Sequence, residues 1–138
     1  MTSSTIRAVL PYAVQRVWAV VLDVPNYCAW RSDLSRAEMV SETRFIEYTR
    51  EGYPTTFTVT AVEPCRKWAF DVENTNLRGC WTGLFSERAD GTELVFTETV
   101  AVKKILMRPF VKSFLKKQQA RFMADLEGYL SGHVGSRN

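Results

Sequence analysis

The stretch PFVKSFLKKQQARFMADLEGYLSG, residues 109–132, decides the fold. Proline is tolerated in the first turn of a helix and glycine is favoured just past its end, so Pro109 and Gly132 predict the limits of one helix. About 22 residues rising roughly 1.5 Å each make a helix of about 33 Å, which is long enough to cross a small domain. We expect its buried face to carry an apolar stripe of Phe110, Val111, Phe114, Leu115, Phe122, Leu126, Tyr129 and Leu130.

The segment before this helix has the pattern of a sheet. From residue 36 to residue 102 apolar and polar residues tend to alternate, which is typical of strands with one buried face. Turn-forming residues divide this segment into six predicted strands: 36–41, 43–51, 55–62, 67–73, 78–87 and 92–102. A strand is also expected at 5–10, then a helix at 13–22 and a short helix at 26–30. Because tight turns join consecutive strands, the sheet is predicted to be antiparallel.

The order of these elements predicts how they pack. A seven-stranded sheet has one apolar face to cover, and the C-terminal helix is the predicted helix long enough to cover it. We therefore predict an α+β fold in which a curved antiparallel sheet wraps around that helix, with the two short helices between strands one and two. Since a sheet cannot close tightly along a whole helix, a cavity is expected. A single domain is predicted over residues 1–138, with a frayed tail at 131–138.

Composition indicates a soluble globular protein. The chain has 138 residues, a net charge of +3 and 46% hydrophobic residues. No apolar run approaches the ~20 residues that a membrane-spanning helix needs. The three cysteines lack paired spacing, which favours reduced thiols and a cytoplasmic location. We expect a monomer or a homodimer.

Several residues, at particular places in this order of elements, resemble those of a known superfamily. They are Val17-Trp18, Asp23-x-x-x-Tyr27-x-x-Trp30, Gly79-x-Trp81, Asp90-Gly91-Thr92 and Asp125-Leu126. Over nearly its full length the chain resembles the START-like, or SRPBCC (Bet v 1-like), superfamily, with the bacterial polyketide cyclase/dehydrase branch nearest. The resemblance implies the helix-grip fold and an internal cavity. It implies no particular activity, because the superfamily includes lipid carriers, hormone receptors, cyclases and co-chaperones without a shared catalytic signature.

Residue types that support metal and cofactor chemistry are scarce. The single histidine, His133, falls in the predicted tail, which argues against His-based triads, His general bases and His-bearing metal sites. The cysteines lack the spacing of zinc ligands. Gly79 and Gly83 lie inside a predicted strand, where they make room for a neighbour or a bend rather than cradle a phosphate. We predict no metal site and no cofactor.

Aromatic residues recur on the strand faces that should point toward the long helix. Taken singly, each ring is more typical of a packed core, but ligand sites are mostly apolar, so the set as a whole predicts a pocket. Trp30 and Arg31 fall where the short helix meets the sheet, which fits a lid contact or a structural plug equally well. The predicted aromatic lining is Trp30, Phe57, Trp68, Phe70, Trp81, Phe85, Phe96, Phe110, Phe114 and Phe122.

Three polar residues interrupt these apolar faces. Glu98 and Glu47 fall on strand faces otherwise occupied by apolar residues, and Gln118 falls inside the apolar stripe of the helix. A carboxylate in an apolar cavity has a raised pKa and can orient a ligand hydroxyl or act as a general acid or base. The alternatives are an ordinary ion pair with Arg78 or Arg50, or a strand register shifted by one residue.

Charge is unevenly distributed along the chain. Seven basic residues and no acidic residue lie between positions 103 and 121. Four of them recur every fourth residue and should form a ridge on the outer helix face: Lys104, Arg108, Lys112 and Lys116. A solvated face is the simplest interpretation, and weak contact with an anionic membrane is the alternative. No nucleic acid partner is predicted, because no stacking platform accompanies these charges.

These features favour a binder or carrier of a hydrophobic small molecule, such as a lipid, polyketide or aromatic compound, held between the sheet and the C-terminal helix. The second hypothesis is a cofactor-independent polyketide cyclase or dehydratase that uses Glu98 or Glu47 as its acid or base. The third is a protein-interaction module without a ligand, which an exposed apolar patch and a filled interior would favour. The sequence leaves the choice between binding and catalysis open.

Overall fold

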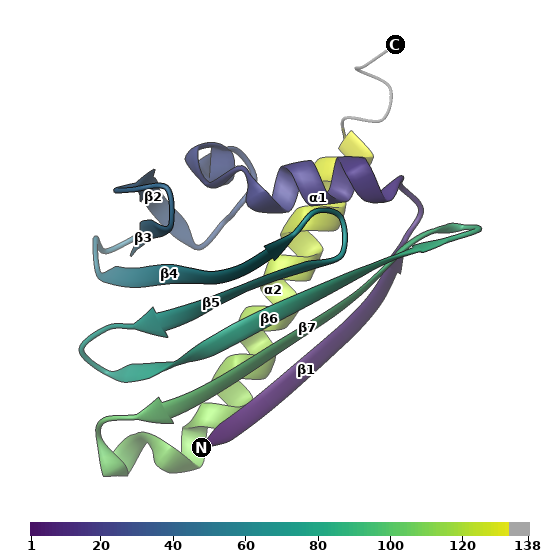
Figure 1. Cartoon of the computed structure of the whole chain (residues 1–138). Coiled ribbons are helices and arrows are strands. Elements are labelled where there is room, and N and C mark those ends of the chain that lie inside the picture. Colours follow the sequence, from purple (N-terminus) through teal and green to yellow (C-terminus); the bar gives the residue numbers. More distant parts are fainter. Residues whose placement is uncertain (133–138) are drawn as a thin grey trace.

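The computed structural model describes residues 1–132 (Figure 1). Within these residues, two 3-10 helices, η1 and η2, accompany two α-helices and seven strands. In chain order the elements are β1 (Thr2–Leu10), α1 (Val14–Leu22), η1 (Val24–Ala29), β2 (Leu34–Met39), β3 (Arg44–Thr49), β4 (Pro54–Glu63), β5 (Lys67–Glu73), β6 (Leu77–Arg88), β7 (Gly91–Val102), η2 (Ile105–Phe110) and α2 (Val111–Gly132).

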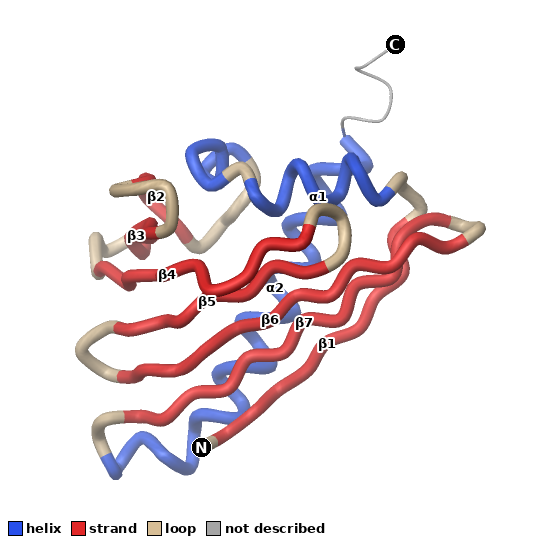
Figure 2. Tube along the Cα trace, viewed as in Figure 1, coloured by secondary structure: helices blue, strands red, loops and turns tan. Residues whose placement is uncertain are grey.

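The strands form one antiparallel sheet in the order β1-β7-β6-β5-β4-β3-β2 (Figure 2). β1 begins at Thr2, earlier than predicted, because Thr2 to Thr5 pair with the far end of β7, with Thr2 opposite Val100. β1 and β2 are the two edges, and α1 and η1 connect them. The curved seven-stranded sheet with its long C-terminal helix confirms the predicted α+β helix-grip fold.

α2 lies across one face of the sheet, from the start of β1 to the neighbourhood of α1 (Figure 1). A buried polar pair attaches its middle to β1: the Ser4 hydroxyl donates to Gln119 Oε1 at 2.7 Å, and Gln119 Nε2 donates to the Ser4 carbonyl at 2.8 Å. At its end, Arg16 Nη2 of α1 donates to the Leu130 carbonyl at 3.0 Å. Both contacts satisfy polar groups that would otherwise be costly to bury.

The first turns of α2 differ from the prediction. Pro109 belongs to η2, and α2 begins two residues later at Val111. Val111 and Leu115 pack against Val100 of β7, and this anchoring turns Phe110 and Phe114 outward, so the predicted apolar stripe is wrong at these two positions. The residues of α2 that are buried are Val111, Leu115, Gln119, Met123, Leu126 and Leu130.

Both ends of the helix also correct sequence expectations. Lys104 lies before η2 and Arg108 within it, so they do not continue the helical ridge that Lys112 and Lys116 form on α2. Ser131 and Gly132, predicted as tail, belong to α2. The rest of that predicted tail, 133–138, and His133 with it, lies outside the described residues. Among residues 1–132, neither α-helix combines the length and apolarity that crossing a bilayer requires.

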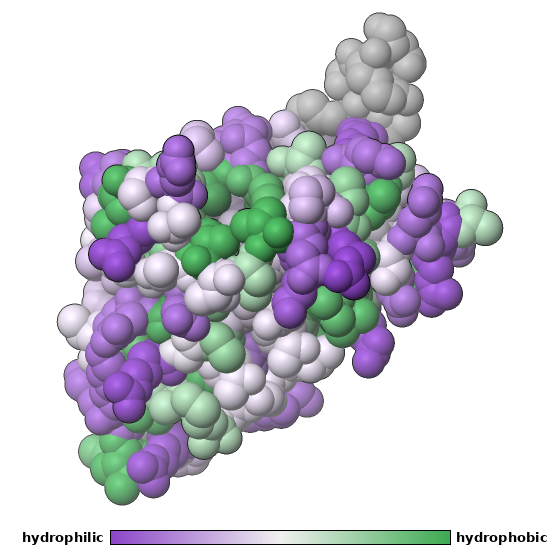
Figure 3. Space-filling view, in the orientation of Figure 1, coloured by the Kyte–Doolittle hydropathy of each residue, from purple (hydrophilic) through white to green (hydrophobic). Residues whose placement is uncertain are grey.

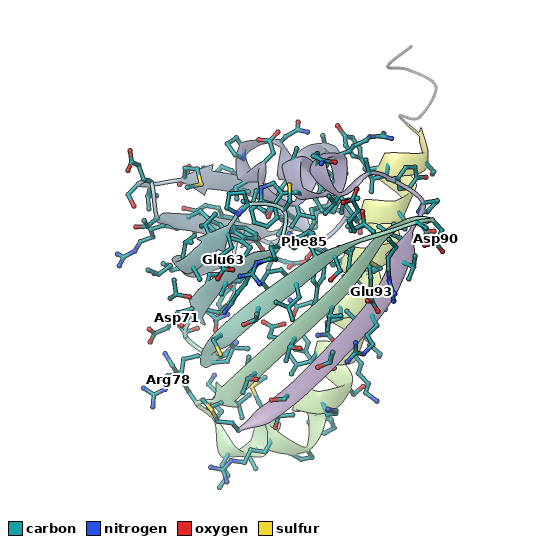
Figure 4. The ribbon with its side chains drawn as sticks, turned by 45° about the vertical axis from the view of Figure 1, so that its right-hand side comes forward. Glu63, Asp71, Arg78, Phe85, Asp90 and Glu93 are labelled. Atoms are coloured by element: carbon teal, nitrogen blue, oxygen red, sulfur yellow. The ribbon has the colours of Figure 1, made fainter. Side chains whose placement is uncertain are left out.

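α1 covers the end of the sheet that is farther from η2. It buries Val14, Val17 and Val21, and Trp18 packs edge-on against Phe85 of β6 with ring centroids 5.0 Å apart. Phe85 therefore lies beneath α1, in the packed core (Figure 4). Because α1 covers this end of the sheet, the space for a pocket lies farther along α2, toward its N-terminus.

Candidate functional site

A pocket of about 140 Å³ lies between the inner face of the sheet and α2. Strands β3 to β7 supply one wall, α2 supplies the opposite wall, and η1 and the chain leading into β2 close one end. Apolar side chains make up most of the wall, and the charged groups on it are Arg31, Asp33, Glu47 and Glu98.

A continuous row of aromatic rings crosses the sheet along this pocket. It takes one ring from each of five neighbouring strands and ends on α2, with successive centroids 4.7 to 5.8 Å apart: Phe45, Phe57, Phe70, Trp81, Phe96 and Phe122. Gly83 makes room for it, because a Cβ there would lie 2.4 Å from the Trp81 ring, as the sequence suggested for this glycine. Aromatic pairs at such distances stabilise by ~0.5–1.5 kcal/mol beyond their buried area, so the row forms a firm wall.

The structure brings most of the predicted site residues together. The strand alternation places both glutamates on the inner face, as the parity of the sequence indicated. Phe114 and Gln118 also line the pocket but are exposed, which places them at its mouth. The predicted residues on the wall are Glu47, Phe57, Trp68, Phe70, Trp81, Phe96, Glu98, Phe114, Gln118 and Phe122.

Three predicted lining residues do not reach the pocket. Phe110 is 68% exposed on η2, because α2 starts only after it. Phe85 is buried beneath α1. Trp30 is buried between Tyr27 and Phe122, with ring centroids 5.6 and 5.3 Å away, and acts as a plug rather than a lid. Within residues 1–132 its indole N–H has no hydrogen-bond partner.

Arg31 holds the closed end of the pocket. Only 8% exposed, it donates from Nε and Nη2 to the Asp33 carboxylate, both at 3.1 Å, and from Nη1 to Glu47 Oε2 at 3.3 Å. Its guanidinium carbon also lies 4.8 Å from the centroid of the Phe122 ring and 5.1 Å from that of Tyr27. Two carboxylates and two rings thus compensate a buried cation, which would otherwise be costly.

The buried ion pair shapes the pKa values around it. Burial lowers the pKa of Arg31, but the charge of Glu47 and the contact with Asp33 outweigh this effect and raise it above its usual value. Burial raises the pKa of Glu47, and the neighbouring Arg31 opposes that rise. Tyr27 donates its hydroxyl to the Val21 carbonyl, and burial raises its pKa. Arg31 and Tyr27 therefore stay protonated, and their role here is to fix the closed end.

Glu98 differs from Glu47 in having no such partner among residues 1–132. It lies on β7 opposite Trp81 of β6, half-buried on the pocket wall. Within the part of the chain that the structure describes, its carboxylate forms no hydrogen bond or ion pair. Burial, with a smaller effect from the charge of Glu47 and an opposing one from Arg31, raises the pKa of Glu98 to about 7. Such a group exchanges a proton near neutral pH.

The open end of the pocket lies beside the start of α2. Thr49, Thr55 and Asn74, at strand ends, line it together with the exposed Phe114 and Gln118. These polar groups give the rim hydrogen-bonding capacity.

Comparison with known proteins supports this architecture. The family model described as "Polyketide cyclase / dehydrase and lipid transport" matches residues 1–131. The chain belongs to this family. No curated protein matched the sequence. The family description joins catalysis and transport, and so leaves the activity of this member open.

Solved structures share the fold of this family member at low sequence identity. A START superfamily protein from Mycobacterium smegmatis has a TM-score of 0.83 and 13% identity, covering 96% of this chain and 98% of its own. The Zhui aromatase/cyclase from Streptomyces sp. R1128 has a TM-score of 0.88 and 12% identity, covering 99% and 98%. A protein from Thermus thermophilus has a TM-score of 0.80 and 15% identity, covering 97% and 100%.

Two residues on the pocket wall, Arg31 and Gln119, are not among those that the sequence predicts for the site. Arg31 pairs with Glu47, 16 positions away, and such a pairing has no signal in the local sequence. Gln119 is the buried glutamine of α2, not Gln118. Its position four residues after Leu115 and four before Met123 was the available signal, since such spacing keeps residues on one helix face. No group of three metal-ligating side chains occurs among the described residues.

Proposed function

We propose that the protein binds a small, mostly apolar molecule in the pocket between its sheet and α2. The observation that carries this proposal is the aromatic row, which faces α2 across an unfilled volume of about 140 Å³. An apolar cavity of about 150 Å³ in a protein holds benzene, whereas pockets for drug-sized ligands begin at roughly 300 Å³. In this conformation the pocket therefore accommodates a portion of ligand about the size of one ring.

The charges on the wall favour one kind of polar group on that ligand. Asp33, Glu47 and Glu98 supply carboxylates. Among residues 1–132, Arg31 is the one basic residue on the wall, and two of the three carboxylates already engage it. A ligand carboxylate would meet net negative charge, whereas a hydroxyl or an ammonium group can donate to Glu98. Ring faces also attract cations, which adds to the preference for an ammonium group.

A matched set of one-ring compounds tests this proposal. Benzylamine, benzyl alcohol and benzoate differ mainly in the charge of one substituent, and their binding can be measured by calorimetry and by ligand-observed NMR at pH 7. We expect benzylamine and benzyl alcohol to bind and benzoate to bind at least about tenfold more weakly, a difference of roughly 1.4 kcal/mol. Native mass spectrometry with organic extraction would identify a species retained from the host.

Two variants on the same strand provide the control. Glu98→Gln removes the charge of the unpaired carboxylate, while Glu93→Gln makes the same change beside Arg88, with which Glu93 forms a 3.0 Å ion pair outside the pocket. Glu98→Gln should weaken benzylamine binding roughly tenfold and leave benzyl alcohol nearly unchanged, and Glu93→Gln should change neither. If none of the compounds binds and nothing is extracted, the ligand-binding proposal is wrong.

A second candidate function rests on Glu98 alone. A carboxyl group with a pKa of about 7, unpaired among residues 1–132 and facing aromatic rings, is suited to proton transfer. In a dehydration, its proton would pass to the leaving hydroxyl to form water, and the resulting carboxylate would take the proton from the adjacent carbon as the double bond forms. The fold shared with an aromatase/cyclase is compatible with this chemistry.

The binding and catalytic functions separate in one experiment. A polyketide-like substrate with a β-hydroxyketone is incubated with wild-type protein, Glu98→Gln and Glu93→Gln, and product is followed by mass spectrometry. If Glu98 is catalytic, Glu98→Gln loses turnover but still binds substrate, and Glu93→Gln keeps both. Equal turnover in wild type and Glu98→Gln would reject this role for Glu98.

A further inference from the structure

Exposed apolar side chains gather at the end of the molecule where β7 leads through η2 into α2. Leu106 is 85% exposed, and four other large apolar residues within ten positions are also exposed: Ile105, Met107, Phe110 and Phe114. We call residues 104–117 the tip. Proteins seldom leave contiguous apolar side chains in water unless the surface meets a partner or a membrane.

The tip is also strongly basic. Lys104, Arg108, Lys112, Lys116 and Lys117 are all exposed, and no acidic residue occurs between positions 103 and 121. Figure 3 shows apolar and hydrophilic residues side by side at the lower end of the view, where Figure 1 places η2. An anionic membrane has negatively charged headgroups above an apolar acyl layer. A surface that combines basic and apolar side chains complements both layers.

The tip is held in place by the fold. Met107 N–H of η2 donates to the carbonyl of Lys104, the residue before this helix, at 3.0 Å, and Lys103 N–H, just before the tip, donates to the Asn76 carbonyl at 2.7 Å. Val111 and Leu115, which belong to the tip, are buried against Val100 and anchor it to the sheet. The exposed side chains are thus presented from an anchored segment, which lowers the entropy lost when they bind.

We propose that the tip docks onto an anionic lipid surface. Ile105, Leu106 and Phe110 would enter the headgroup layer while the surrounding basic residues face lipid phosphates. A second copy of the chain is a poorer occupant, because two tips facing one another bring like charges together. A nucleic acid is poorer too, because its phosphates match the basic residues but leave the apolar side chains without a partner.

The tip adjoins the mouth of the pocket. Phe114 belongs to both, and Lys103, the residue just before the tip, donates from Nζ to the carbonyl of Asn74, a residue of the rim, at 2.8 Å. Docking would therefore hold the mouth against the lipid, where an apolar ligand could pass without crossing water. This last step rests on the proposed ligand-binding function, whereas docking itself does not.

Vesicle flotation tests the docking. Purified protein is mixed with vesicles of phosphatidylcholine alone, or with about one third phosphatidylglycerol, in low salt and near 0.15 M salt, where charges are screened within roughly 8 Å. We expect binding to the anionic vesicles, weakened by salt, and little binding to phosphatidylcholine. Leu106→Ser should lower the partition coefficient roughly tenfold or more, and a Lys104→Gln/Arg108→Gln double variant by roughly fivefold for each charge.

Leu84→Ser is the matched control. Leu84 is another exposed leucine, on β6 and outside the tip, so its replacement should leave vesicle binding unchanged. Equal binding to both vesicle types, no binding to either, or equal losses in Leu84→Ser and Leu106→Ser would overturn the proposal. The proposal would also be overturned if analytical ultracentrifugation showed a dimer that Leu106→Ser abolishes, while neither wild type nor Leu106→Ser bound vesicles. Because the ring compounds are measured without lipid, failure here leaves the ligand-binding proposal standing.

Discussion

The two ends of α2 differ in what covers them. At the C-terminal end, Leu126 and Leu130 are fully buried, Met123 nearly so, and α1 and the Trp30 plug lie over the helix. At the N-terminal end, Val111 and Leu115 are buried, while Phe114 is exposed, as is Phe110 of η2 just before the helix. The same kind of residue thus forms core at one end and surface at the other. The pocket lies between them, with Arg31 at its closed end and Phe114 at its mouth.

This contrast separates residues that stabilise the fold from residues available for contacts. Burial of apolar area contributes to stability only where other atoms of the chain provide the cover. The covered end should therefore respond to mutation with loss of stability. Substitutions at the exposed N-terminal end should weaken the proposed binding to lipid and change the free energy of unfolding little. The expected sizes can be ranked.

The largest effect is expected at Arg31. The Arg31→Met substitution leaves Glu47 and Asp33 without their buried cation. Breaking such a pair lowers the free energy of unfolding by roughly 3–5 kcal/mol. Urea unfolding at pH 7 should show this loss, and the double variant Arg31→Met/Glu47→Gln should recover part of it. A loss below about 1 kcal/mol would mean that Arg31 does not hold the closed end.

A leucine pair compares the two ends of the helix region directly. Leu126→Ala removes a fully buried side chain at the covered end and should cost roughly 2–5 kcal/mol in urea unfolding. Leu106→Ala removes an 85% exposed side chain at the bare end and should change stability by no more than about 0.5 kcal/mol. Similar losses in both variants would show that η2 is covered in solution.

An effect smaller than those at Arg31 and Leu126 is expected between the two ends, at Glu98, and it depends on pH. Because burial raises its pKa to about 7, the folded protein binds this proton more tightly than the unfolded chain, whose glutamate titrates near about 4.3. The resulting stability is fully present below about pH 4 and is lost as pH rises to about 7. Glu98→Gln, which keeps no charge, should therefore be more stable than wild type at pH 8 by roughly 1–3 kcal/mol.

Urea unfolding at a series of pH values measures that difference, and Glu93→Gln is again the control. Glu93 lies on the same strand with a surface ion pair to Arg88, so its variant should follow wild type within about 0.5 kcal/mol at every pH. A constant difference between Glu98→Gln and wild type from pH 4 to pH 8 would contradict the raised pKa.

Local sequence patterns were sufficient for the fold and for much of the pocket wall. Alternation in the strands placed Glu47 and Glu98 on the inner face, since residues two apart share a face whatever the rest of the chain does. The end of α2 was predicted within its last turn, and the β5 bounds matched the prediction at 67–73. Each of these features depends on neighbours within a few residues.

Tertiary structure alone decided which of the inward residues have partners. Arg31 reaches Glu47 across 16 positions and so leaves Glu98 unpaired among the described residues, and neither fact has a local signature. The packing of Val111 and Leu115 on Val100 set the rotation of α2, which buried Gln119, placed Gln118 at the rim and exposed Phe114. A local pattern determines that a helix or strand has an apolar face. Whether a residue of that face becomes part of the core, the pocket or the exposed surface depends on which other parts of the chain pack against it.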